Sequence, residues 1–226
     1  MPKAIIFDAS TLISFAMNGL FDEIVKLKEN FDGKFIITKE VKGEIIDRPL
    51  TIKRFELEAL RLKGLFDDNI LEPPLSLGVK DSEVTSRSAE LLDIANATFE
   101  ANGRKMHIVD MGEVSCLALS QILNKQGVKN VIAVDERTAR MLVEKPENLE
   151  KLFEKKLHTK VRSNLNNFNF FKEFKIIRST ELVYLAYKKG LVHLKNGQVL
   201  DALLYALKFK GCSISDEEIR EIEKLN

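Results

Sequence analysis

The stretch that begins at Lys3 constrains the fold of this chain most strongly. The four apolar residues from Ala4 to Phe7 form a short, bounded run that is typical of a fully buried strand. Asp8 follows directly, and from Leu12 onward the apolar residues have helical spacing. Open α/β sheets build sites from a strand that ends in a carboxylate and leads into a helix. Asp8 also suits a plain helix cap, so this stretch alone leaves both roles open.

The composition narrows the class of protein. The chain has 226 residues, of which 45% are apolar and 31% charged, enough to bury a sizeable core. Its formal net charge is +1, so a nucleic-acid-binding surface would need local clustering of Lys and Arg. Two cysteines and three scattered histidines predict neither a disulfide framework nor a zinc site. The apolar runs are too short for a membrane span and no signal peptide is evident, so we expect a soluble, cytoplasmic protein without membrane contact.

Strands and helices are predicted to alternate along the chain. After the first strand we expect strands over Phe35–Thr38, Lys129–Val134 and Ile176–Ile177. The predicted helices cover Lys39 to about Asp47, Thr51–Lys63, Ser82 or Ser86 to about Asn102, the run after Glu113 to Lys125, Thr138–Val143, Thr180–Lys189, Val199–Phe209 and a short segment from Asp216. This alternation predicts an α/β fold with a central parallel sheet of four or five strands, covered on both faces. We expect one domain over 1–226, with a core of about 1–178 and a helical extension of about 179–226.

Other acidic residues recur in positions similar to that of Asp8. Asp135 also follows a predicted buried strand, with Glu136 expected to point the other way. Glu44 shares a helix face with core residues, although it could be an ordinary surface glutamate. Asp110 and Glu113 have the spacing of a capping box at a helix start, which accounts for Asp110 better than for Glu113.

Several carboxylates at one edge of a sheet would repel one another and raise one another's pKa. Folding would disfavour this cluster unless a cation neutralised it. Oxygen donors of this kind suit Mg²⁺ or Mn²⁺ better than zinc or copper. Such ions activate water for attack on a phosphoryl group, so the sequence points to hydrolysis of phosphodiesters.

Four motifs, in this order, resemble those of the PIN-domain nucleases, in particular the VapC-like relatives with a Gly-Glu motif. The motifs are Ile5-Ile-Phe-Asp8-Ala-Ser10, Val41-Lys-Gly-Glu44, Asp110-Met-Gly-Glu113 and Val134-Asp135-Glu136-Arg137. The resemblance implies a three-layer α/β/α fold with extra C-terminal helices. It also implies an Mg²⁺- or Mn²⁺-dependent endoribonuclease that hydrolyses single-stranded or structured RNA, as a toxin or in RNA processing.

The resemblance also implies roles for single residues. The catalytic residues would be Asp8, Glu44, Glu113 and Asp135. The same four would hold the metal, with Asp110 as a fifth ligand. Ser10, Arg137 and Arg140 are the candidates for substrate binding. Besides RNA, an antitoxin-type protein and a second copy of the chain are the candidate partners.

Other interpretations stay open. The chain is longer than compact VapC toxins, with extra residues around 51–105 and 147–174. A phosphatase of the haloacid-dehalogenase kind also places an Asp after its first strand, but it needs a second Asp where Ser10 stands. A receiver-like signalling module usually has a paired acid before the Asp of its first strand and a Lys after a late strand, and neither is evident in this sequence. The main alternative is a PIN-fold protein that binds RNA or assembles with partners without catalysis.

The segment from Lys151 to Arg178 has two interpretations. It holds eight Lys or Arg and two Glu, a net charge of about +6. Four phenylalanines, Phe168, Phe170, Phe171 and Phe174, are interleaved with these charges. The rings could stack on single-stranded RNA bases, or they could complete the core beneath a charged surface.

Overall fold

The computed structural model describes residues 2–194 and 196–225, and its centre is a parallel sheet of four strands. The strand order is β2–β1–β5–β7, with bounds Lys34–Ile36, Lys3–Phe7, Lys129–Ala133 and Ile176–Ile177. In the register of the central pair, Phe7 lies opposite Ala133. The α/β class and the parallel sheet predicted from sequence are thereby confirmed.

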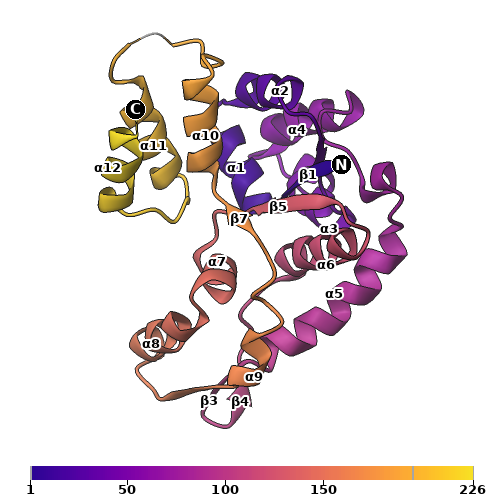
Figure 1. Ribbon diagram of the computed structural model, residues 1–226, viewed down its shortest axis with the longest axis vertical. Helices are drawn as coiled ribbons and strands as arrows, with labels where there is room; N and C mark the ends of the chain where they lie inside the picture. The colour runs from indigo at the N-terminus through magenta and orange to yellow at the C-terminus, as the bar shows by residue number, and fades with distance from the viewer. Residues whose placement is uncertain (1, 195, 226) are drawn as a thin grey trace.

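Helices cover both faces of this sheet (Figure 1). One face carries α1 (Ala9–Met17), α2 (Phe21–Glu29) and α10 (Ser179–Lys188), and the other carries α3 (Lys39–Lys42), α5 (Asp81–Asn96) and α6 (Met111–Lys125). Most side chains of α6 are buried, because this helix lies between the sheet and α5. No helix in the described part of the chain combines the length and apolarity that a membrane crossing needs.

The predicted C-terminal helices are present. After α10 come α11 (Val199–Phe209) and α12 (Asp216–Lys224), which pack beside α10 at one end of the molecule (Figure 1). Arg178 ties this extension to the sheet, because its guanidinium bonds Glu181 at 2.6 Å and Glu218 at 2.8 Å. These ion pairs hold α12 against the start of α10.

The segment after α3 departs from the predicted helices. The expected helix from Lys39 to about Asp47 is α-helical only to Lys42 and continues as a π-helical turn, Gly43–Asp47. A 3₁₀ turn, Pro49–Thr51, follows, so α4 covers Glu56–Asp67 and starts later than predicted. After α4, Glu72 pairs with Ile36 of β2 by a single bridge, and a second 3₁₀ turn, Pro74–Leu77, follows.

A second, antiparallel sheet was not predicted. Its order is β4–β3–β6, with bounds Arg104–Lys105, Phe99–Ala101 and Val161–Ser163. The helix expected to reach about Asn102 ends at Asn96, so that prediction was wrong. Asn102 and Gly103 have φ values of 52° and 74°, which make the two-residue turn of a hairpin.

This small sheet lies at the end of the molecule opposite α11 and α12 (Figure 1). It packs with α8 (Pro146–Leu157) and α9 (Leu165–Phe168). The chain reaches it from the central sheet through α7 (Arg137–Glu144). The small sheet and these two helices therefore form a satellite unit, built by the extra residues around 147–174 and by the last few of those around 51–105.

Phenylalanines form the core of the small sheet. The Phe99 ring centroid lies 5.3 Å from that of Phe153 and 5.8 Å from that of Phe168. Phe171 and Phe174 are buried as well, which supports the core interpretation over RNA stacking. Phe170 is the exception in the segment, with 42% of its surface exposed.

We predict that Phe99→Ala lowers the free energy of unfolding by about 3 to 5 kcal/mol, the usual loss for a buried Phe replaced by Ala. Phe170→Ala is the matched control and should change it by less than about 0.5 kcal/mol, because that ring is exposed. Urea denaturation followed by circular dichroism measures both values. Equal losses in the two variants would contradict this assignment of the core.

Candidate active site at the sheet edge

Asp8 lies at the C-terminal end of β1 and is almost fully buried. It is the N-cap of α1, and its Oδ2 accepts hydrogen bonds from the Ser10 N–H at 2.9 Å and the Ser10 hydroxyl at 2.5 Å. Burial raises the pKa of Asp8, and the Ser10 hydrogen bonds offset part of this shift. Asp8 is therefore a helix cap, as one of its two predicted roles required, and its burial disfavours the ionised carboxylate.

Asp135 follows β5 and is fully buried beside the start of α10. Its Oδ1 accepts the Ser179 N–H at 2.8 Å, and its Oδ2 accepts the Ser179 hydroxyl at 2.7 Å. Its own N–H donates to the Ser10 hydroxyl at 3.0 Å, so the ends of β1 and β5 are joined. Both carboxylate oxygens of Asp135 thus anchor α10, a role that the sequence did not reveal.

Glu44 reaches the site from the π-helical turn. Its carboxylate lies against Gly112 at the start of α6, where a Cβ would come within 2.5 Å of the Glu44 Oε1. Only glycine leaves room for this approach. Glu44 is an exposed residue, as the surface alternative predicted, but its carboxylate is partly covered at this contact. This partial burial raises the pKa of Glu44, and the charges of Asp8 and Asp110 raise it further, while a hydrogen bond from the Gly112 N–H opposes them.

Glu113 stands in the first turn of α6 and is partly buried. Its Oε2 accepts the Asp110 N–H at 2.5 Å, which is one half of the predicted capping box. Burial raises the pKa of Glu113 to about 8, with further contributions from the charges of Asp8, Glu136 and Asp110. The Glu113 carboxylate is therefore largely protonated at neutral pH when no cation is bound.

Glu136 contributes to this site although we expected it to point away. Its Oε2 caps α7 by accepting the Ala139 N–H at 2.8 Å, and its charge still acts on Glu113. The alternation of side chains along a strand could not predict the direction of the Glu136 side chain, because β5 ends at Ala133. The only signal was its place next to Asp135.

Cys116, one turn after Glu113 on α6, marks where the acidic residues gather. Burial raises the pKa of its thiol, and the charges of Asp8, Glu113 and Glu44 raise it further. Asp8, Glu113 and Cys116 also line one small cavity of about 10 Å³, room for about one water molecule. Three acids from β1, the π-helical turn and α6 therefore share one neighbourhood.

The remaining predicted site residues have surroundings that differ from those of the buried acids. Asp110 is exposed and accepts a contact of 2.8 Å from His107. Arg137 is exposed, and the Arg140 Nε lies 3.7 Å from Glu144 on its own helix. The Ser10 hydroxyl donates to the Asp8 carboxylate and accepts the Asp135 N–H, so its hydrogen bonds serve the two strand ends.

The carboxylates of Asp8, Glu44 and Glu113 are donors of the kind that divalent cations prefer, but their side chains do not form a complete metal-binding site. Among residues 2–194 and 196–225, no three His, Cys, Asp or Glu side chains converge closely enough to hold a metal ion. None of the ion pairs between described residues involves Asp8, Glu44 or Glu113. Uncompensated oxygen donors of this kind suit Mg²⁺ or Mn²⁺, and binding would require their side chains to rotate toward one another.

An apolar groove of about 400 Å³ adjoins these acids. Glu44 lies on its edge, and the rest of its lining is mostly apolar, including Ile13, Met17, Ile52 and Phe55. These four side chains are 38% to 43% exposed. The groove is therefore an accessible apolar surface next to a charged one.

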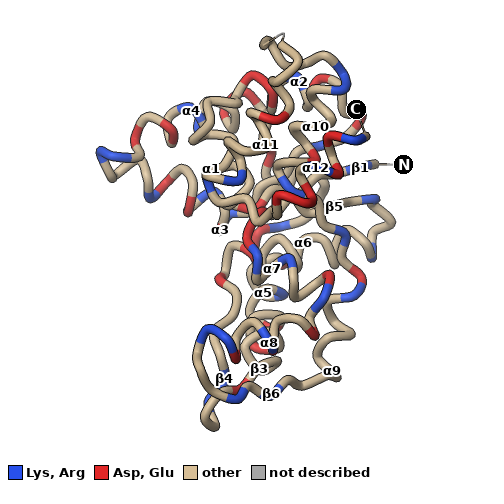
Figure 2. The backbone as a smooth tube through the Cα atoms, turned by 90° about the vertical axis from the view of Figure 1, so that its left-hand side faces the viewer, with Lys and Arg blue, Asp and Glu red and all other residues tan. Residues whose placement is uncertain are grey.

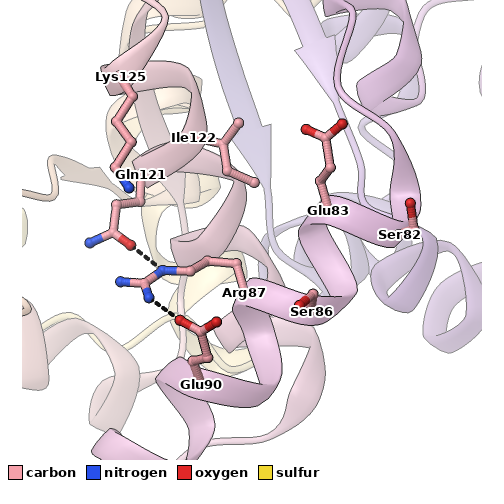
Figure 3. Close-up of a pocket in the computed structure, with 8 residues that line it drawn as sticks. All are labelled: Ser82, Glu83, Ser86, Arg87, Glu90, Gln121, Ile122 and Lys125. Atoms are coloured by element: carbon pink, nitrogen blue, oxygen red, sulfur yellow. Dashed lines mark hydrogen bonds and ion pairs between the residues drawn. The ribbon is translucent and has the colours of Figure 1, made fainter.

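A second hollow, of about 410 Å³, lies between α5 and α6 (Figure 3). Its central cation, Arg87, donates to Gln121 at 2.6 Å and pairs with Glu90. The acids described above do not line it. It is therefore separate from the candidate site.

Comparisons of this chain with protein-family models, with curated proteins and with solved structures found no match. The resemblance to PIN-domain nucleases thus rests on the four motifs, and the function has to be argued from the site.

We predict that the metal-free protein loses stability as the pH rises. The folded chain keeps a proton on Glu113 up to about pH 8, whereas the ordinary value is 4.5. The free energy of unfolding should therefore fall between these two values, by at most about 1.4 kcal/mol per pH unit for this group. Glu113→Gln keeps an acceptor for the Asp110 N–H and should show a shallower fall.

Urea denaturation in EDTA across this pH range measures the effect. Glu29→Gln, an exposed glutamate on α2, is the control and should follow the wild type. A fall in Glu113→Gln as steep as that of the wild type would refute the assignment to Glu113.

Proposed function

We propose that this chain is a PIN-like, Mg²⁺- or Mn²⁺-dependent endoribonuclease. The observation that carries the proposal is that Asp8, Glu44 and Glu113 lie near enough at one sheet edge to act on the same groups through their charges, with no ion-pair partner among the described residues. Perturbed acids of this kind are more frequent at functional sites than elsewhere. Their place beyond the carboxyl ends of parallel strands is where α/β sheets bind ligands.

In this proposal, some residues of the site would hold the metal and others position those ligands. Asp8, Glu44 and Glu113 would hold the metal, with Asp110 and Glu136 nearby. The bound ion would lower the pKa of water and stabilise charge on the phosphoryl group. Ser10 fixes the Asp8 carboxylate through two hydrogen bonds, and Gly112 lets Glu44 approach the start of α6.

One observation favours the non-catalytic alternative. Both oxygens of Asp135 are bonded to Ser179, so the fourth acid of the motif series is engaged in holding α10. A PIN-fold protein that binds RNA without cutting it would tolerate this arrangement. A cleavage assay separates the two functions.

We predict that Asp8→Asn and Glu113→Gln each lower Mn²⁺-dependent RNA cleavage by about a hundredfold or more, because each removes a charge from the reacting site. The matched controls are Asp93→Asn and Glu29→Gln, which change exposed residues elsewhere. Gel analysis of a labelled single-stranded RNA, with and without EDTA, gives the rates. Cleavage that persists in EDTA, or that both site variants leave unchanged, would contradict the nuclease proposal.

We also propose that the groove beside Glu44 receives an unstacked RNA base next to the phosphate that is cut. Its lining is apolar, Phe55 offers an exposed ring, and Arg48 on the same lining can contact a phosphate. Bases stack on aromatic side chains in this way when they are single-stranded. This would make single-stranded RNA the substrate form.

Removal of that base should lower kcat/KM by about tenfold, the usual value of one stacked base. A series of RNAs with one abasic position each would show a single sensitive position next to the cut. Phe55→Ala should abolish this sensitivity, whereas Phe209→Ala, an exposed residue on α11, should not. Equal cleavage at every abasic position would contradict the assignment of the groove.

A further inference from the structure

Six cationic side chains gather at the far end of the small sheet, which we name the cationic tip. All six are exposed and come from three segments of the chain: Arg104, Lys105, Lys155, Lys156, Lys160 and Arg162. A hydrogen bond of 3.1 Å from the Thr159 hydroxyl to Asn102 joins the turn before β6 to the turn between β3 and β4. Figure 2 shows blue segments around β4 and α8 at this end of the molecule.

The pairing of the strands places part of this charge on one face. Lys105 and Arg162 both lie opposite Glu100 of the central strand, so they flank a single acid. The opposite face of the sheet holds Phe99 and Val161, which are buried. The outer face therefore carries Lys105 and Arg162, and the inner face is core except at Arg104, which lies opposite Ala101 at the hairpin end and is exposed.

The nearby acids Glu100, Glu150 and Glu154 offset half of the formal charge of the six cations, so a positive excess remains. Glu150 accepts a hydrogen bond from the Ser163 hydroxyl, and Glu154 accepts the Val161 N–H at 3.2 Å. None of the six cations forms an ion pair with another described residue, whereas Lys28, Lys34 and Lys208 elsewhere on the chain do. In a chain whose net charge is +1, this is a strong local excess of positive charge.

We propose that the cationic tip binds the phosphates of single-stranded RNA outside the cleavage site. The choice of RNA rests on the proposed function, whereas the preference for a polyanion rests on the tip alone. Lys and Arg side chains that contact RNA phosphates release the counterions condensed on the RNA, which favours binding and makes it salt-dependent. The tip connects to the acidic edge through α7 and α8, so one RNA chain could contact both.

The test is binding of a fluorescent single-stranded RNA in EDTA, measured by anisotropy at several salt concentrations. The tip variant combines Lys105→Ala, Lys160→Ala and Arg162→Ala. The control variant combines Lys125→Ala, Lys129→Ala and Lys210→Ala, which remove the same charge from other exposed positions. Circular dichroism melting checks that both variants fold.

We expect the tip variant to bind RNA at least about tenfold more weakly, with a slope of log affinity against log salt that is smaller by about 2, or about 0.7 per lost contact. The control variant should bind like the wild type. Equal losses in both variants, no loss in the tip variant, or no binding by the wild type would overturn the proposal. Displacement of RNA by polyglutamate at equal charge would also overturn it, in favour of an acidic protein partner.

Cleavage measured in parallel separates this proposal from the proposed function. Tip-dependent binding without Mn²⁺-dependent cleavage would leave the tip assignment standing and remove the nuclease. Asp8-dependent cleavage together with normal RNA binding by the tip variant would support the nuclease and overturn the assignment of the tip.

Discussion

The hydroxyl of Ser10 connects the two central strands at the edge on which the candidate site depends. It donates to the Asp8 carboxylate and accepts the Asp135 N–H, so β1 and β5 end in a fixed relation. Asp135 in turn holds the start of α10 through Ser179. Buried polar groups need such partners, and here they form one continuous series from the first strand to the C-terminal helices. The position of the acids at the sheet edge and the packing of the C-terminal helices therefore depend on the same series of hydrogen bonds.

The same edge contains charge that the fold does not compensate. Asp8, Glu44 and Glu113 have raised pKa values because burial and mutual repulsion disfavour their ionised forms. By contrast, Arg178, the residue directly before α10, is half-buried and is paired with two glutamates. Acids that lack such a partner cost local stability, and acids with shifted pKa values are more frequent at functional sites than elsewhere.

Local patterns in the sequence predicted the parts of the fold that depend on near neighbours. The apolar run before Asp8, the capping spacing of Glu113 and the strand before Asp135 all appear in the structure. The small sheet was missed because β3 pairs with β6, far along the chain, and its strands are only three residues long. The partner of Asp135 was missed for the same reason, since Ser179 is 44 residues away. Sequence spacing could identify the acids, but it could not show which of them would be satisfied by the fold.

The distribution of charge connects the acidic edge with the cationic tip. An RNA phosphate approaching Asp8, Glu44 and Glu113 is repelled unless a cation lies between them. Attraction at a separate place would offset this repulsion, because contacts along a polyanion act together on one chain. In the proposed function, the cationic tip on the small sheet would supply this attraction, and the packed rings of Phe99, Phe153 and Phe168 hold α8 and α9 against that sheet. The tip would then bind the RNA backbone at a place where the acids do not repel it.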